Sequence, residues 1–139
     1  MRLRDLMSRD PITLQPTSSL REALDLMHRY DIHELPVVES ETVVGIVTAH
    51  DLGAMLGPAV RDVDETQLDD DTLSQPVEQV MTPNPATVLQ HARVADVCRM
   101  LVDLRVGSLP VVDMEERLVG IVSVTDLLSA MARMLEPEE

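Results

Sequence analysis

The chain has 139 residues, and 25 Asp and Glu against 11 Lys and Arg give it a formal net charge of −14 at pH 7. This acidity excludes a basic surface for nucleic-acid phosphates, and an aromatic content of 1% excludes a stacking platform for single strands. No apolar run approaches the roughly 18–20 residues of a membrane span, and the single cysteine, Cys98, excludes an internal disulfide. We therefore expect a cytoplasmic protein that binds neither nucleic acid nor membrane.

Each half of the chain shows the same order of predicted elements. Apolar residues between positions 20 and 27, and again between 94 and 101, recur at the i, i+3, i+4, i+7 spacing of one helix face. Two short apolar runs follow each helix, Leu35–Val38 with Val43–Thr48 and Leu109–Val112 with Leu118–Ser123. A second helix is expected to begin near residue 49 and near residue 124. With a short strand before the first helix, each half reads β-α-β-β-α, which predicts an α/β fold whose two copies pack together to cover their sheets.

These two halves are a sequence repeat. A displacement of 74 residues places Leu35–Val38 on Leu109–Val112, and after one inserted residue near Arg117 a displacement of 75 places Asp51 on Asp126. Only two copies are present, which indicates a paired module rather than a solenoid. We expect motif 1 at residues 1–56, an acidic linker at 57–76 and motif 2 at 77–139.

A hydroxyl residue, two variable residues and an aspartate stand at the start of each closing helix, as Thr48-x-x-Asp51 and Ser123-x-x-Asp126. This spacing is typical of helix capping. The same geometry also suits a ligand, because the free amides of a helix N-terminus attract phosphate and one carboxylate accepts hydrogen bonds from a vicinal diol. Ribose on the aspartate and phosphate on the helix end would together bind a nucleotide.

The chain resembles a tandem pair of CBS (cystathionine-β-synthase-type) domains, also called a Bateman module. The resemblance runs from about Leu3 to Leu135 without the connector, and its motifs are Met81-Thr82-Pro83-x-Pro85, Val106-Gly107-Ser108-Leu109-Pro110-Val111-Val112-Asp113 and the two G-x-x-[TS]-x-x-D segments. It implies two β-α-β-β-α CBS motifs packed with pseudo-twofold symmetry. It also implies a regulatory, non-catalytic homodimer that binds adenosine-containing ligands between its motifs.

The resemblance further implies which residues contact the ligand. Asp51 and Asp126 would bind ribose, while Thr48, His50, Ser123 and Thr125 would lie near ribose or phosphate. Residues ahead of the first strand and before the Leu-Pro segment would complete the sites: Ile12, Thr13, Ile32, His33 and Glu34 in motif 1, and Ala86, Thr87, Val106, Gly107 and Ser108 in motif 2. Asp126 is expected to share a site with Thr13 and His33, and Asp51 with Thr87 and Gly107.

Motif 1 departs from this pattern where His33-Glu34 replaces the Gly107-Ser108 of motif 2. Glu34 adds a carboxylate and His33 adds bulk, so we expect inequivalent sites, with adenine nucleotide held more tightly at the site of Asp51 and Gly107. No arginine lies in either hydroxyl-x-x-Asp segment, which favours AMP or ADP over ATP. S-adenosylmethionine, NAD and a cyclic dinucleotide are the other candidate ligands.

These observations agree best with a nucleotide-sensing module that regulates a separate protein. The alternative is a ligand-free dimerisation or protein-interaction module. An enzyme is not expected, because no nucleophile–base arrangement or glycine-rich phosphate loop recurs. The four histidines lack metal-ligand spacing, so neither a metal nor a required cofactor is expected. The closing helix carries a broad apolar stripe that would serve a dimer contact or lie wholly in the core: Leu127, Leu128, Met131, Met134 and Leu135.

Overall fold

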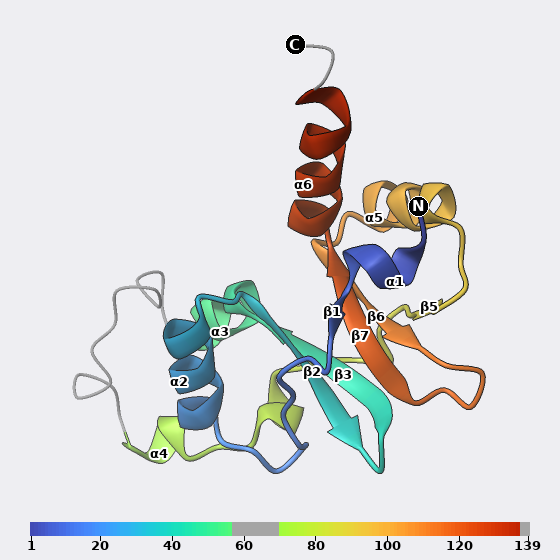
Figure 1. The fold of residues 1–139 in the computed structure, drawn as a ribbon. Coiled ribbons are helices and arrows are strands. Elements are labelled where there is room, and N and C mark those ends of the chain that lie inside the picture. The colour runs from blue at the N-terminus through green and yellow to red at the C-terminus, as the bar shows by residue number, and fades with distance from the viewer. Residues whose placement is uncertain (57–69, 137–139) are drawn as a thin grey trace. The chain divides into compact units, whose positions relative to one another are not determined.

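The computed structural model describes residues 1–56 and 70–136, so most of the expected linker, residues 57–69, lies outside the described part of the chain. The chain divides into two compact units (Figure 1). The continuous unit is Ile12–Pro85, and the two-segment unit combines Met1–Pro11 with Ala86–Glu139. The expected motif boundaries at residues 56 and 76 follow the sequence repeat and stay a prediction.

The continuous unit contains a three-stranded antiparallel sheet in the order β2-β3-β4, formed by Glu34–Glu39, Thr42–Thr48 and Thr82–Pro83. The β2–β3 hairpin turns through Ser40 and Glu41, whose φ angles of 50° and 69° are those of a tight two-residue turn that matches the twist of the strands. On the other edge of β2, Leu14 pairs in parallel with Val37. The predicted strands of motif 1 are therefore confirmed within one residue at their ends.

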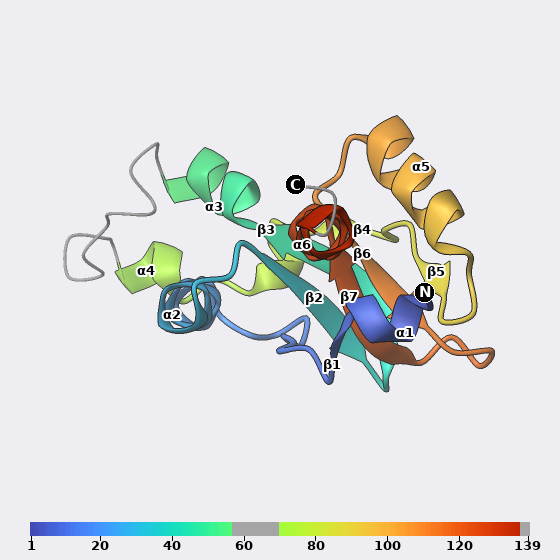
Figure 2. The same ribbon diagram turned by 45° about the horizontal axis from the view of Figure 1, so that its top comes forward.

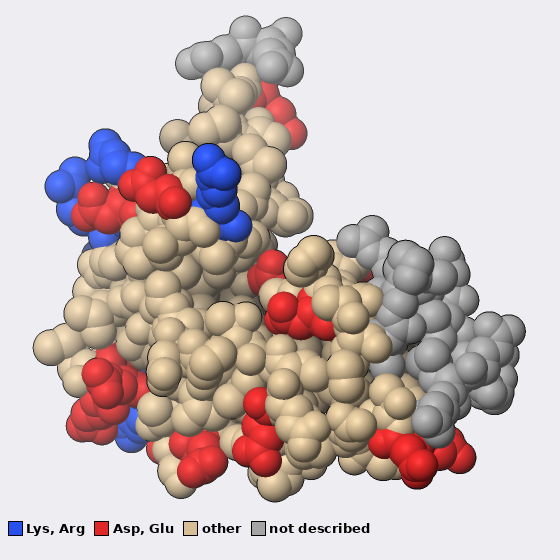
Figure 3. Space-filling model, turned by 180° about the vertical axis from the view of Figure 1, so that it is seen from behind, with Lys and Arg blue, Asp and Glu red and all other residues tan. Residues whose placement is uncertain are grey.

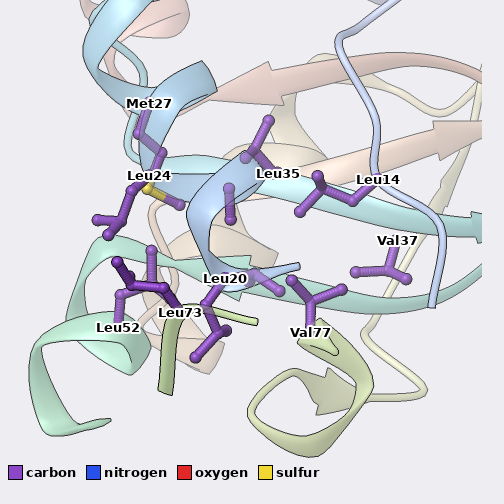
Figure 4. Packing of buried hydrophobic residues seen from close by; sticks show 11 residues of the cluster. Leu14, Leu20, Leu24, Met27, Leu35, Val37, Leu52, Leu73 and Val77 are labelled. Atoms are coloured by element: carbon purple, nitrogen blue, oxygen red, sulfur yellow. The ribbon is translucent and has the colours of Figure 1, made fainter. Parts of the chain in front are cut away.

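The continuous unit also contains helices α2 (Leu20–Tyr30), α3 (Ala49–Leu56) and α4 (Asp70–Leu73) and the 3-10 helix η2 (Val77–Gln79). Helix α2 lies beside α4 in both Figure 1 and Figure 2. The Ser19 hydroxyl caps α2 by accepting a 3.1 Å hydrogen bond from the amide of Glu22. The predicted apolar stripe of α2 is buried, because it packs with strand residues and with Leu52, Leu73 and Val77 in one core (Figure 4).

The two-segment unit has a four-stranded sheet in the order β1-β7-β6-β5. Its strands are Ser8–Arg9, Leu118–Ser123, Ser108–Val112 and Val88–Leu89, and only the β5–β6 pair is parallel. Helices α1 (Leu3–Leu6), α5 (Val94–Leu104) and α6 (Val124–Leu135) accompany the sheet, and α6 contacts both α1 and α5. A second core forms here, which includes Val97, Leu101 and Leu109.

The first strand of each motif joins the sheet that contains the other motif's hairpin. β1 pairs with β7, and β4 pairs with β3. A glycine in each hairpin leaves room for a methionine beside the incoming strand, so that Met7 packs on Gly120 and Met81 packs on Gly45. This exchange is the reason that the compact units do not follow the boundaries of the sequence repeat.

The apolar stripe of α6 is largely exposed. Leu128, Met131 and Met134 have exposed fractions of 59%, 55% and 62%, whereas Leu127 packs against the core. The interpretation in which all five stripe residues lie inside the core is therefore wrong. Among the described residues, no helix combines the length and the apolarity needed to cross a membrane.

Candidate functional site

The Thr48 cluster lies where β3 ends and α3 begins. The Asp51 amide donates to Thr48 Oγ1 at 3.0 Å, and the Thr48 amide donates to Asp51 Oδ2 at 3.0 Å. These reciprocal bonds satisfy two amides that the start of a helix would otherwise leave without partners. They use one oxygen of the aspartate, and within the described part of the chain Asp51 Oδ1 has no hydrogen-bond partner.

The Ser123 cluster repeats this arrangement where β7 passes into α6. The Asp126 amide donates to Ser123 Oγ at 3.0 Å, and the Ser123 amide donates to Asp126 Oδ2 at 2.9 Å. Helix capping, the plainer interpretation of both sequence segments, is therefore confirmed. It does not exclude ligand binding, because each carboxylate keeps a second oxygen and, within the described residues, the amide of the second helix residue, His50 in α3 and Thr125 in α6, has no hydrogen-bond partner.

The segments that precede β2 and β6 are tied to the same helix starts. The Ala49 amide donates to the carbonyl oxygen of His33 at 2.8 Å, and the Val124 amide donates to that of Gly107 at 2.9 Å. These bonds place residues 33–34 beside the Thr48 cluster and residues 107–108 beside the Ser123 cluster.

Glu34 and Ser108 are the first residues of their strands and lie opposite the capping hydroxyls. Glu34 is the cross-strand partner of Thr48, and Ser108 is that of Ser123, so the side chains of each pair share one face of the sheet. Burial of Glu34 raises the pKa of its carboxyl. Ser108 is 6% exposed, and its hydroxyl has no hydrogen-bond partner among the described residues. Both positions thus hold a partly or wholly buried polar group next to a helix start.

The other predicted site residues lie at the margins of these clusters. Ile12 and Thr13 lead into Leu14, which runs beside β2, and Ala86 and Thr87 lead into β5, which runs beside β6. Ile32 packs against its unit's core, whereas Val106 is 39% exposed, and His50 and Thr125 are exposed in the first turns of α3 and α6. Within each unit, the structure brings the hydroxyl, the aspartate and the strand start together. The pairing of Asp51 with Thr87 and of Asp126 with Thr13 stays a prediction.

A cavity in the continuous unit adds residues that the sequence did not single out. This cavity, of about 320 Å³, lies between the end of α2 and the start of α3, and its lining adds His28 and Asp31 to the predicted His33. The corresponding groove of the two-segment unit, of about 360 Å³, is lined by apolar residues alone, with Val102 at the repeat position of His28. Comparison of the two copies at a displacement of 74 would have revealed this contrast. Among residues 1–56 and 70–136, no group of three His, Cys, Asp or Glu side chains is placed to hold a metal ion.

A comparison with known protein families identifies the fold. The family model described as CBS domain matches residues 3–53 and 77–133, which together are well over half of the chain. The chain belongs to the CBS domain family. The expected fold class, an α/β Bateman module of two CBS motifs, is thereby confirmed.

A relative and two solved CBS pairs share this CBS architecture. A CBS domain-containing protein of Dictyostelium discoideum is 33% identical over 137 residues, which cover 97% of this chain and 94% of that protein. CBSX2 from Arabidopsis thaliana, solved in complex with AMP, has a TM-score of 0.79 at 29% identity and covers 96% of this chain and 97% of its own. The CBS domain pair of protein MJ0100, solved with 5′-methylthioadenosine and S-adenosyl-L-methionine, has a TM-score of 0.76 at 26% identity. The match covers 94% of this chain and 99% of the MJ0100 domain pair.

Some relatives of this CBS pair are much larger enzymes. Inosine-5′-monophosphate dehydrogenase of Methanocaldococcus jannaschii is 31% identical over 125 residues, a match that covers 89% of this chain and 22% of the enzyme. The similarity is therefore confined to a small part of that enzyme, and it says nothing about the enzyme's chemistry in this chain.

Proposed function

We propose that this CBS pair is a regulatory, non-catalytic module that binds an adenosine-containing ligand and transmits ligand status to a separate protein in the cytoplasm. The observation that carries the proposal is the repeated helix start, in which a capped aspartate keeps one carboxylate oxygen free. CBS pairs of similar fold have been solved with AMP, 5′-methylthioadenosine and S-adenosyl-L-methionine, which supports adenosyl ligands in particular.

Each cluster contains one group that suits ribose and other groups that suit phosphate. A free carboxylate oxygen accepts hydrogen bonds from ribose hydroxyls and repels phosphate, so Asp51 and Asp126 suit ribose. The amides of His50 and Thr125 in the first turns of α3 and α6, with the side chains of Thr48, His50, Ser123 and Thr125, suit a phosphate. No arginine lies within either hydroxyl-x-x-Asp segment to neutralise a triphosphate, which favours AMP or ADP over ATP.

We place two sites in the module and expect them to differ. One would combine Asp51 with Thr87 and Gly107, and the other Asp126 with Thr13 and His33. Ligand binding switches such a module only if the ligand has different affinities for two arrangements of the protein. The protein that reads the change would be a separate polypeptide.

Isothermal titration calorimetry with AMP tests the aspartates. Asp51→Asn and Asp126→Asn keep an oxygen for the cap but replace the free carboxylate oxygen by an amide donor, so each variant is expected to lose at least about tenfold in affinity at its site. Asp113→Asn, in the β6–β7 turn, is the matched control and should leave AMP affinity unchanged. A larger loss from Asp126→Asn than from Asp51→Asn would contradict the assignment of the tighter site to Asp51.

The exposed face of α6 favours a second role, self-association. Most of the part of α6 that is visible in Figure 3 belongs to residues other than Asp, Glu, Lys and Arg. The exposed residues of this helix include Leu128, Met131 and Met134. Exposed apolar patches of this kind mark interaction sites. We propose a homodimer, and light scattering at micromolar concentration should give the dimer mass for the wild type and the monomer mass for Met131→Glu. A dimer that shows no thermal shift with any adenosyl ligand would favour the interaction module instead.

A further inference from the structure

Glu34 and Ser108 occupy the same place in the two motifs, because they are 74 residues apart and each starts the second strand of its motif. Each lies opposite the hydroxyl residue that caps the following helix. The strand pairing therefore puts both side chains beside the helix end that suits a ligand.

The Ser108 hydroxyl is buried without a hydrogen-bond partner among the described residues. Buried polar groups are nearly always paired, and a native exception needs an explanation. The Ser123 Oγ across the ladder already accepts from the Asp126 amide, as part of the cap. A ligand seated beside Ser108 would supply the partner that the described residues do not.

Glu34 is equally without a hydrogen-bond or ion-pair partner within the described residues, and burial raises its pKa. The capped aspartate of either site is a second carboxylate, and no arginine lies in either hydroxyl-x-x-Asp segment. A half-buried carboxylate of this kind gains from a hydrogen-bond donor or a cation, and it opposes a second anion at short range. A serine at the equivalent position donates a hydrogen bond to phosphate without a charge conflict.

We propose that Glu34 determines ligand charge: the site that it lines takes an adenosyl ligand without phosphate, neutral or cationic at its 5′ end, while the site lined by Ser108 takes the phosphate-bearing nucleotide. This inference rests on the proposed adenosyl-binding function. It implies that one module reads two chemically different adenosyl ligands at once, because the two copies present different side chains at one repeat position.

Calorimetric titration with AMP and with 5′-methylthioadenosine tests the proposal. The wild type is expected to bind one AMP per chain, with any second AMP at least about tenfold weaker, and to take 5′-methylthioadenosine while AMP is bound. Glu34→Ser copies the motif 2 residue into motif 1 and should yield two AMP sites of similar affinity. Glu34→Gln keeps the shape of the side chain and should also strengthen the second AMP site, which gives an independent measurement should the serine variant fail to fold.

Glu39→Ser is the matched control, because Glu39 is the exposed last residue of the same strand and its loss changes the net charge equally. This variant should bind AMP as the wild type does, and an equal gain from it would overturn the proposal in favour of a general charge effect. Two equivalent AMP sites in the wild type, or no change in Glu34→Ser, would also overturn it and leave the proposed function intact. Failure of the wild type to bind either ligand, by calorimetry and by thermal shift, would overturn this inference, and failure with every adenosyl ligand would overturn the proposed function as well.

Discussion

The two compact units share one arrangement of strands and helices but differ in the side chains next to their helix caps. In both, a hydroxyl and an aspartate cap the closing helix with nearly identical distances, and the strand before it pairs in the same register. Next to these caps the copies diverge, since His33-Glu34 stands in one and Gly107-Ser108 in the other. The grooves between paired helices diverge too, with His28 and Asp31 at the edge of one and apolar residues alone in the other.

This contrast separates folding constraints from binding constraints. Cores and caps contribute to the stability of each unit, so both copies require them. The side chains of Glu34 and Ser108 form no hydrogen bond with other described residues, so hydrogen bonding within the fold does not dictate which side chain stands there. Differences between copies at such positions therefore point to what each copy binds, and the predictions that follow probe where the copies should respond alike and where they should not.

The largest difference between the two copies is expected in the loss of stability when the glycine beside each exchanged strand is replaced by alanine. A Cβ at residue 120 would lie 2.9 Å from the Ser8 carbonyl oxygen, which belongs to the backbone and must shift. A Cβ at residue 45 would mainly meet the flexible end of Met81, with the Thr82 carbonyl oxygen at 3.1 Å. We expect Gly120→Ala to lower the free energy of unfolding by about 1–3 kcal/mol and Gly45→Ala by less. Urea unfolding followed by circular dichroism measures both, and an equal loss would contradict the stated difference.

Removal of either helix cap should lower the free energy of unfolding by a similar amount. Thr48→Ala and Ser123→Ala each remove the hydroxyl that accepts from the aspartate amide, and each should cost about 1 kcal/mol of unfolding free energy. Replacement of the exposed Thr125, one residue into α6, by alanine is the control and should change stability by less than about 0.5 kcal/mol. A loss of unfolding free energy at only one of the two caps would show that the copies differ in the caps themselves as well as in the side chains next to them.

Much of this architecture follows from the sequence, because repeated apolar patterns specify each long element twice. The stripe that begins at Leu20 predicts α2, and the run Leu109–Val112 predicts β6, within a few residues of the observed ends. Strands of two residues carry no such pattern, so the sequence could not reveal that β1 joins β7. The capped aspartates follow from spacing alone. The missing partner of Ser108 does not, because it depends on the atoms around a buried side chain.

The smallest effect concerns the pH response of Glu34 in the ligand-free protein. Burial raises the pKa of this carboxyl, so the folded state binds its proton more tightly than the unfolded state. The folded state is therefore favoured fully below the ordinary glutamate pKa, and this contribution is lost as the pH rises through the raised value.

Glu34→Gln has no proton to lose, so it should match the wild type near about pH 4 and exceed it at neutral pH by on the order of 0.5–1 kcal/mol. Urea unfolding at the two pH values measures this difference, and Glu39→Gln on the same strand should show none. Ser108→Ala, at the equivalent place in the other unit, should change stability by the same small amount at both pH values, because a hydroxyl does not titrate in this range. A Glu34→Gln difference that is independent of pH would mean that Glu34 is solvated in the folded protein. The charge contrast between positions 34 and 108 would then lose its energetic basis.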